Sequence, residues 1–467
     1  MFYRLFTFLF FILLATRVPA QNYAAYNIEV LARLTPNIAD QGFDGRRYSG
    51  CWGWYQANKN KEYAIAGTSN GTYFYDITNA QSPVQKGFIQ GTQGATYREI
   101  KTKDHYAYII SDDITPNGLQ IVDLQYLPDS LPLLYSGDAF FKRAHSAWVD
   151  GRHLYLASTT FSNNFSPMTV WSLANPTAPV LMRRLEQDFP FINLVHDMHT
   201  RNDTIYASCA NQGLFVFYFD TLSGKFLQLG SYSGFAGAGY NHSSALTADG
   251  KSLVFCEEIP AALPIQLLNV SNPSNVTALC QLLPYPKTTP HNPFVKGQFA
   301  FISCYEDGLF IYDISNPANP SRAGYFDTYY QGGANTGVYG PINYRGNWGN
   351  YPFLPSGHLI ANDMQNGLFI LDASAAYTTT VKDYLGFANL EQKEKVSLEV
   401  RAKTITLLNP SHENVHFKLK DVCGKVLQTK DFNCSTEIDL SEFSIGVYIC
   451  QLYTQQLQIQ KKIIIQD

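Results

Sequence analysis

Short apolar runs alternate with turn residues along most of the chain. A segment of the form Gly-apolar-x-apolar-x-Asp-apolar recurs, and Asn-Pro follows several of its copies. Clear copies begin at Gly71, Gly118, Gly308 and Gly367, and degenerate copies lie at residues 168–173, 213–217 and 265–270. The copies recur about every 40 to 60 residues, a spacing typical of repeat architectures.

The sixth repeat shows the repeating unit most clearly. It contains strand patterns at residues 291–295, 299–304, 309–314 and 321–326, with turn residues between them. Four short strands per repeat at this period are typical of a β-propeller blade. We therefore expect an all-β chain whose main domain, residues 26–374, is a seven-bladed β-propeller. An open β-solenoid is the alternative, although these repeats are longer than typical β-helix coils.

The two ends of the repeat region are complementary. The seventh repeat has no clear fourth strand after residues 367–372, and an unassigned strand pattern at residues 27–34 precedes the first repeat. We expect these two segments to pair. The N-terminal strand then completes the seventh blade, and no sheet edge stays open.

Residues 1–20 have the pattern of a secretory signal peptide. Arg4 precedes an apolar run at residues 5–15, and Val18-Pro19-Ala20 offers small residues for cleavage after Ala20. An uncleaved membrane anchor is the alternative, but the run is shorter than the about 20 residues that span a bilayer. We expect the mature chain to be secreted or at the outer cell surface, with no transmembrane segment.

Composition supports a strand-and-turn protein. Aromatic residues make up 14% of the chain and charged residues 15%, with Gly 33 and Pro 23, which favours β-structure. The formal net charge is -4, and the absence of a basic stripe in the sequence argues against nucleic acid as a partner.

The eight cysteines do not read as one disulfide framework. Cys209, Cys256 and Cys304 end similar apolar runs in different repeats, so we expect them to be small buried hydrophobic residues. Cys423 and Cys434 remain a candidate disulfide.

The repeat region resembles the LVIVD repeat and the propeller of the choice-of-anchor B family of exported bacterial proteins. The resemblance rests on the Gly-Leu-x-Ile-x-Asp-Ile-Ser-Asn-Pro segments and on an ordered set of further motifs. These are Tyr97-Arg98-Glu99-Ile100, Ala144-His145-Ser146, Val195-His196-Asp197, Pro290-His291-Asn292 and residues 348–357. It implies export and surface attachment through a C-terminal anchor, and it supplies no catalytic activity.

Residues 396–467 form a separate small β-pattern after a linker at residues 375–395. Its motifs are Gly424-Lys425-Val426, Ile438-Asp439-Leu440, Gly446-Val447-Tyr448 and the late Lys461-Lys462. Their order resembles the type A sorting domain of the type IX secretion system, although the usual Tyr-Pro-Asn-Pro opening is here Leu407-Leu408-Asn409-Pro410. The resemblance implies a Bacteroidota host, an immunoglobulin-like β-sandwich, the type IX machinery as partner and removal of the domain on export. A small adhesive immunoglobulin-like domain is the alternative.

Polar residues recur at the start of successive repeats, where the first strand of a blade lines the central channel. The candidates for channel lining are Arg98, Glu99, His145, His196, Asp197, His242, His291 and Asn292. Of these, His145, His196, His242, His291 and Glu99 are candidate ligands of a divalent metal ion. Hydrogen bonds within each blade are the favoured explanation of the histidines, ahead of a site for a metal ion, a small anion or water, and acid–base catalysis is a third interpretation.

No sequence motif assigns a catalytic residue. The chain lacks the Gly-x-Ser-x-Gly elbow and the P-loop, and Glu257-Glu258 reads as a turn. A long Gly-rich connection at residues 331–348 is a candidate contact surface for a protein or glycan, and filling of space at the channel mouth is the equal alternative. We therefore expect an exported binding or interaction module rather than an enzyme. The alternative is a secreted metal-dependent or glycan-active enzyme with its site in the channel.

Overall fold

The computed structural model describes most of the propeller and much of the C-terminal segment. The described residues are 23–36, 38, 45–92, 97–112, 118–282, 284–285, 288–330, 345–378, 397–401, 404–408, 414–421, 425–433, 436–444, 446–453 and 458–465. The predicted signal peptide, Cys423 and Cys434, and most of the linker and of the 331–348 connection lie outside them. No helix within these described ranges is long and apolar enough to cross a membrane.

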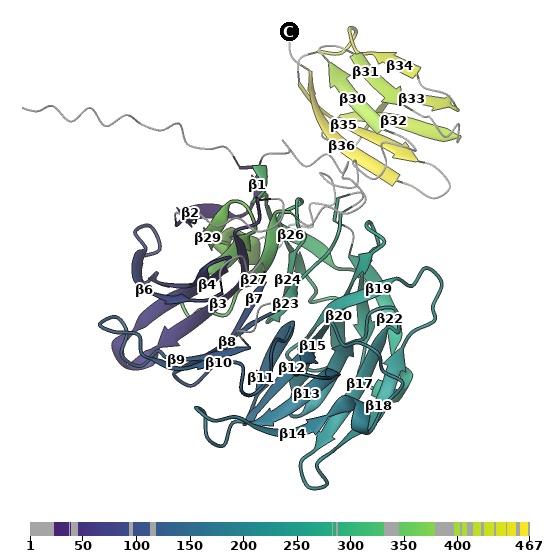
Figure 1. Ribbon diagram of the computed structural model, residues 1–467. Helices are drawn as coiled ribbons and strands as arrows, with labels where there is room; N and C mark the ends of the chain where they lie inside the picture. The colour runs from purple at the N-terminus through teal and green to yellow at the C-terminus, as the bar shows by residue number, and fades with distance from the viewer. Residues whose placement is uncertain are drawn as a thin grey trace, which may run out of the picture.

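Seven antiparallel sheets form the described chain between residues 25 and 372, and they lie around a common centre (Figure 1). The first sheet contains β3 (Tyr48–Gln56), β4 (Lys61–Thr68), β5 (Gly71–Asp76) and β6 (Val84–Gln90). The second contains β7 (Arg98–Lys103), β8 (Tyr106–Ser111), β9 (Leu119–Asp123) and β10 (Leu133–Gly137). The third contains β11 (Ser146–Asp150), β12 (His153–Thr160), β13 (Phe165–Ser172) and β14 (Val180–Arg184). The fourth and fifth contain β15 (Asp197–Arg201), β16 (Thr204–Ser208), β17 (Leu214–Asp220) and β18 (Lys225–Tyr232); and β19 (Tyr240–Leu246), β20 (Ser252–Ile259), β21 (Ile265–Asn269) and β22 (Thr277–Leu282). The last two contain β23 (Pro293–Lys296), β24 (Phe299–Ser303), β25 (Leu309–Asp313) and β26 (Ser321–Phe326), joined by β1 (Ala25–Tyr26); and β27 (Asn347–Tyr351), β28 (Leu359–Asp363) and β29 (Gly367–Asp372), joined by β2 (Glu29–Leu34).

The first strands of the seven sheets make a closed cycle of contacts. Each first strand contacts the first strand of the next sheet, and the last pair is β27 with β3. This arrangement is a β-propeller, as the repeats predict, and the seven sheets fit the seven predicted blades. The first strands therefore line the central channel.

The recurring Asp of the repeat ends the third strand of its blade and holds the following turn. In four blades its Oδ1 accepts a hydrogen bond from the backbone N–H two residues later, at Asp76, Asp123, Asp313 and Asp372. This is the local bond that favours Asp in turns. The Asp of the repeat motif is thus explained by turn formation.

The predicted ring closure is confirmed. Strand β2 pairs antiparallel with β29, with Glu29 opposite Asp372 and Leu34 opposite Leu368. The structure adds a feature that the sequence did not indicate, because β1 pairs with β26 of the sixth blade. Asn27 lies between β1 and β2 with a φ of 55° and donates to the carbonyl of Ala323.

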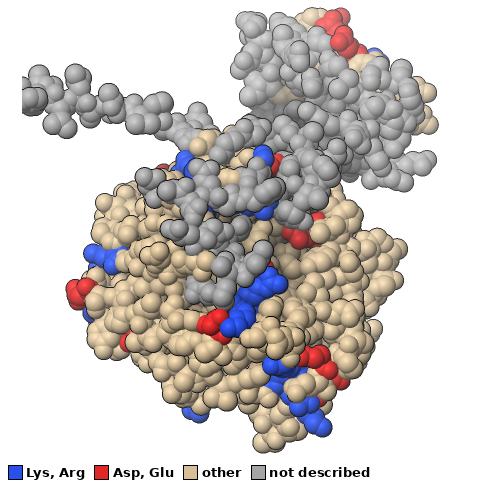
Figure 2. Space-filling view, in the orientation of Figure 1, with Lys and Arg blue, Asp and Glu red and all other residues tan. Residues whose placement is uncertain are grey.

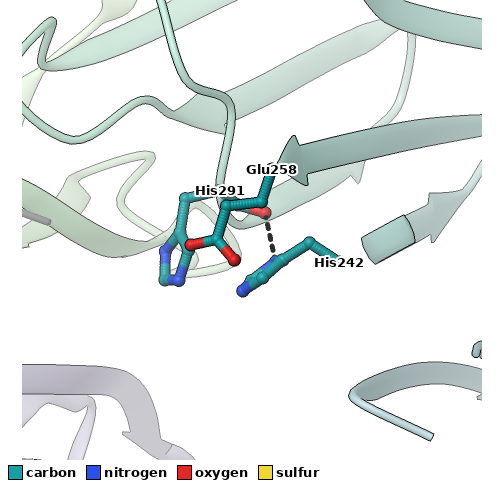
Figure 3. A group of neighbouring side chains, drawn as sticks. All are labelled: His242, Glu258 and His291. Carbon is teal, nitrogen blue, oxygen red and sulfur yellow. Dashed lines mark hydrogen bonds between the residues drawn. The ribbon is translucent and has the colours of Figure 1, made fainter. Parts of the chain in front are cut away.

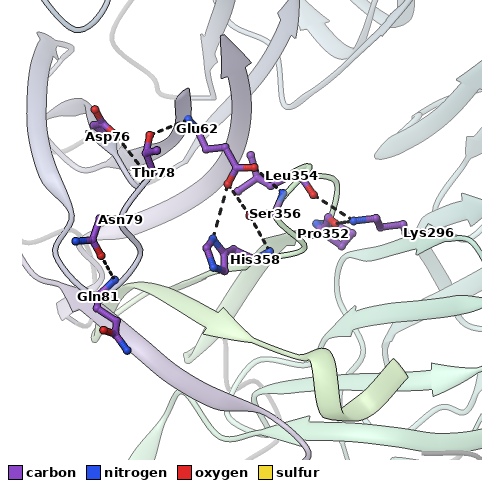
Figure 4. Close-up of polar contacts among 10 residues, drawn as sticks. All are labelled: Glu62, Asp76, Thr78, Asn79, Gln81, Lys296, Pro352, Leu354, Ser356 and His358. Carbon is purple, nitrogen blue, oxygen red and sulfur yellow. Dashed lines mark hydrogen bonds and ion pairs between the residues drawn. The ribbon is translucent and has the colours of Figure 1, made fainter. Parts of the chain in front are cut away.

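A loop after β27 joins three blades (Figure 4). Glu62 of β4 accepts hydrogen bonds from the backbone N–H and the hydroxyl of Ser356, at 2.7 and 2.6 Å. Lys296 of the sixth blade donates to the carbonyls of Pro352 and Leu354. The seventh blade is therefore held to both neighbours by charge-assisted hydrogen bonds.

The core of each blade interface is apolar, and three cysteines belong to it. Cys209, Cys256 and Cys304 are buried and form no disulfide with any described residue. They pack within apolar clusters, as predicted.

A short helix, α1 (Ser374–Thr378), follows β29.

The C-terminal segment consists of two antiparallel sheets. One contains β30 (Ser397–Arg401), β31 (Thr404–Leu408) and β34 (Thr436–Asp439), and the other β32 (Val415–Asp421), β33 (Val426–Phe432), β35 (Gly446–Tyr453) and β36 (Gln458–Ile465). Ile405, Leu407 and Ile438 of the first sheet share one buried core with Phe417 and Leu452 of the second. Two sheets around one apolar core form a β-sandwich, as predicted.

The surface is weakly charged over the described residues in view. In Figure 2, Lys, Arg, Asp and Glu occur in separate small groups on a largely uncharged face.

Candidate functional site

Six rings, one from each of the second to seventh blades, form a closed circle inside the propeller. Neighbouring centroids lie 6.5 Å apart for Tyr97–His145, 4.2 Å for His145–His196, 4.1 Å for His196–His242, 4.3 Å for His242–His291, 4.3 Å for His291–Trp348 and 4.8 Å for Trp348–Tyr97. The four candidate histidines thus lie next to one another around the channel axis.

The backbone at the start of each inner strand places these rings. The backbone N–H groups of His145, His196 and His291 donate to the second strands of their own blades, to the carbonyls of Ala157, Ser208 and Ser303. In the fifth and seventh blades the register shifts at His242 and Trp348, between Asn241 and Ser243 and between Asn347 and Gly349. Such bulges re-aim a side chain.

The ring nitrogens of three histidines bond to the next blade. Nδ1 of His196 lies 3.2 Å from the backbone oxygen of His242, and Nδ1 of His242 lies 3.1 Å from that of His291. Nδ1 of His291 lies 2.5 Å from the backbone oxygen of Trp348. Because a carbonyl only accepts, each Nδ1 carries the hydrogen, and Nε2 keeps its lone pair. These bonds therefore join blades, whereas the scaffold interpretation placed them within single blades.

The ring histidines differ in charge. Burial and the neighbouring imidazoles lower the pKa of His196 and His242 well below the ordinary value. Burial lowers the pKa of His291 to about 3. Burial also opposes protonation of His145, but its hydrogen bond to Asp112, at 2.7 Å, outweighs this effect and raises its pKa. At neutral pH His196, His242 and His291 are therefore neutral bases.

Glu258 is a site residue that the sequence analysis missed. Glu257 and Glu258 lie in β20 and are buried, so their interpretation as a turn is wrong. Tyr305 donates its hydroxyl to Oε1 of Glu258 at 2.6 Å, and burial raises the Glu258 pKa to about 7. A signal was available in the sequence, because Glu257 and Glu258 directly follow the apolar run at residues 253–256, and the strand continues through both residues.

Glu258 lies beside two of the ring histidines (Figure 3). One ligand atom from each of His242, Glu258 and His291 lies within 4.8 Å of the others. In the figure the Glu258 carboxylate points at the space between the two imidazoles. Among the described residues, this is the group of three or more His, Cys, Asp and Glu side chains with a spacing suited to a metal ion.

Glu99 and Asp197 also line the cavity, but they have other partners. Glu99 forms an ion pair with Lys101, and Asp197 accepts a hydrogen bond from the Ser146 hydroxyl. Burial raises the pKa of both carboxyl groups. Asn292 lines the cavity too and donates to the backbone oxygen of Trp348 at 2.9 Å.

Arg98 is a correction to the predicted channel set. Its side chain is buried and donates to the carbonyls of Thr68 and Thr92, at 2.8 and 2.7 Å. Arg98 is therefore directed into the contact with the first blade, because the alternation of β7 turns Glu99 and Lys101 toward the channel instead.

The cavity inside this ring is small and partly closed by aromatic rings. Its volume is about 50 Å³, which holds an ion or a few water molecules. The ring centroid of Phe294 lies 6.3 Å from that of Trp148 and 5.9 Å from that of Trp52. Nζ of Lys101 lies 4.4 Å from the centroid of the Trp52 ring. The cavity therefore suits a small ligand or the tip of a larger one.

Comparison with known families identifies two segments of the chain. Residues 395–466 match the secretion system C-terminal sorting domain, and residues 294–328 match the LVIVD repeat. The chain carries a type IX sorting domain. The resemblances to the LVIVD repeat and to a type IX sorting domain are thus confirmed, and the sorting domain marks the chain as exported. Kinship with the choice-of-anchor B family stays a prediction.

Several solved structures are similar to this chain. A protein from Lactobacillus plantarum has 15% identity and a TM-score of 0.46, over 84% of this chain and 99% of that one. A putative 6-phosphogluconolactonase from Bacteroides uniformis has 12% identity and a TM-score of 0.47, over 80% and 94%. The C-terminal WD40 domain of Sif2 has 10% identity and a TM-score of 0.44, over 74% and 97%. No curated protein matches the sequence.

Proposed function

We propose that this protein is an exported binding module, secreted or held at the outer cell surface, whose propeller binds a ligand in its central channel. The sorting domain supports delivery by the type IX secretion machinery. The propeller supports binding because inner strands from several blades contribute side chains to one cavity. The partner is a protein or a glycan that inserts a small polar group there.

The state of the His291 imidazole carries the proposal. Its Nδ1 is bonded to the Trp348 backbone, whereas its Nε2 is buried without a hydrogen-bond partner among the described residues. A buried polar atom left without a partner costs about 1–3 kcal/mol. A ligand that binds Nε2 recovers this free energy, which a purely structural histidine does not explain.

A variant that fills the cavity tests the proposal. Gly349 lines the cavity, and a Cβ at this position meets open space. We expect Gly349→Leu to retain the wild-type melting temperature and to lose binding on a glycan array and to immobilised surface proteins. Leu222→Ala, on a turn where Leu222 is 97% exposed, is the control and retains binding. Unchanged binding by a folded Gly349→Leu variant refutes a channel site.

A further inference from the structure

The ligand atoms of His242, Glu258 and His291 form a set that differs from the set the sequence indicates. The sequence indicates Glu99 as the carboxylate beside the histidines. Glu99 forms an ion pair with Lys101, whereas Glu258 lies beside the histidines on the second strand of the fifth blade. Two imidazoles and one carboxylate remain for an ion.

We propose that His242, Glu258 and His291 bind one divalent transition-metal ion, and that Zn²⁺ fits this ligand set. The inference rests on the proposed function, because it identifies the metal ion as one ligand of the same binding channel. Two His and one Glu are a known ligand set for Zn²⁺ sites that keep one position open for water or a substrate. Mg²⁺ and Ca²⁺ prefer sites made of oxygen ligands.

The distances permit such a site. Three atoms within 4.8 Å of one another have a common point no farther than about 2.8 Å away (4.8 Å divided by √3), and Zn²⁺ takes ligands at about 2.0 to 2.2 Å. Each ligand atom therefore has to approach by less than about 1 Å. Rotation of the Glu258 carboxylate and small tilts of the rings supply this movement.

The hydrogen bonds around the three residues orient them as a metal site requires. Nδ1 of His242 and Nδ1 of His291 donate to backbone carbonyls, which leaves Nε2 of each ring as the ligand atom. Tyr305 donates to Oε1 of Glu258 and so orients the carboxylate. Bonds of this kind fix the tautomer and the direction of metal-ligating groups.

Burial of the ligand residues favours a bound cation. His291 is 1% exposed and Glu258 is 7% exposed. His291 is also packed against the rings of Tyr305 and Trp348, with centroids 4.4 and 4.3 Å away. A bound cation compensates the buried carboxylate charge and uses the Nε2 atom of His291 that has no other partner among the described residues.

Isothermal titration calorimetry of the mature chain with Zn²⁺ tests the site. The protein carries no histidine tag and is stripped with EDTA beforehand. We expect one Zn²⁺ per chain and no comparable heat with Mg²⁺. Glu258→Gln, which keeps the Tyr305 bond, should weaken Zn²⁺ binding by more than about 100-fold, because even outer-shell partners are worth 10- to 100-fold. Tyr305→Phe should weaken it by about 10- to 100-fold.

Glu99→Gln is the matched control, since Glu99 lines the same cavity. We expect its Zn²⁺ affinity to equal that of the wild type. Absence of Zn²⁺ binding, or binding that Glu99→Gln abolishes and Glu258→Gln does not, overturns the inference. Since His242→Ala and His291→Ala also remove bonds between blades, Glu258→Gln is the decisive variant.

The two proposals fail in different ways. If Zn²⁺ does not bind, or if Glu99→Gln and not Glu258→Gln abolishes its binding, while Gly349→Leu still loses glycan or protein binding, the metal inference is overturned and the proposed function stands. If Zn²⁺ binds with the expected variant pattern and Gly349→Leu leaves glycan and protein binding unchanged, the metal inference stands and the proposed binding site is refuted.

Discussion

Nδ1 of His242 donates a hydrogen bond to the backbone oxygen of His291, 3.1 Å away, and this bond crosses from the fifth blade to the sixth. The hydroxyl of Ser243, the next residue along the chain, donates to the same oxygen. Both bonds join neighbouring blades. The His242 bond also fixes Nε2 as the nitrogen available to a ligand.

Two replacements of His196 separate the contribution of the hydrogen bond between blades to stability from the contribution of the imidazole ring. His196→Asn keeps an N–H donor for the His242 oxygen, whereas His196→Ala removes it. We expect Ala to lower the free energy of unfolding by about 1–3 kcal/mol, because it leaves a buried group without its bond, and Asn to cost less. Urea denaturation measures both values. Equal losses for the two variants contradict a role for the blade-to-blade bond.

Ring closure by β2 predicts a large effect of a small deletion. Removing residues 21–35 exposes the edge of β29, which β2 covers by strand pairing. An unpaired edge strand promotes association with other chains. We expect a lower melting temperature and aggregation in light scattering, and an unchanged melting temperature contradicts closure by this strand.

The stability that Asp327 and Asp363 contribute should fall as the pH rises from about 4 to about 7. Burial raises the pKa of Asp327 to about 7 and that of Asp363 to about 6, from an ordinary value of 3.8. In this window the unfolded state has already released the proton that the folded state keeps, so rising pH favours unfolding. Asp327→Asn keeps an acceptor for the Tyr329 N–H and removes this titration.

Melting temperatures at pH 5 and pH 8 check this expectation. From pH 5 to pH 8 the melting temperature of Asp327→Asn should fall less, or rise more, than that of the wild type. An equal change in both proteins shows that Asp327 titrates in the folded state as it does in the unfolded state.

The two end segments predict the mature form. We expect the extracellular chain to begin at Gln21 and to lack most of residues 396–467, because a signal peptide and a sorting domain are removed on export. Mass spectrometry of culture supernatant and washed cells identifies both ends. A chain that keeps Met1 or stays in the cytoplasm contradicts export, and a retained C-terminal domain favours the adhesive alternative.

Local patterns predicted most of the fold. The repeated Gly and Asp of each blade report strand ends and turns, which depend on neighbouring residues, and the pairing of residues 27–34 with 367–372 followed from a missing fourth strand. The position of β1 on the sixth blade was not predicted, because two residues carry no periodicity.

The site was predicted less completely than the fold. Equivalent positions in successive repeats brought His145, His196 and His242 together, since the repeat symmetry determines where they lie. Symmetry does not indicate Glu258, which occurs in one blade, nor the direction of Arg98, which depends on the strand alternation of β7.

Anomalous X-ray diffraction at the zinc edge, from crystals of the mature chain grown with Zn²⁺, tests most directly whether the channel is a ligand site. The account predicts one strong peak about 2.0 to 2.2 Å from Nε2 of His242, Nε2 of His291 and a carboxylate oxygen of Glu258. A channel without a peak, or a peak beside Glu99 and away from Glu258, contradicts it.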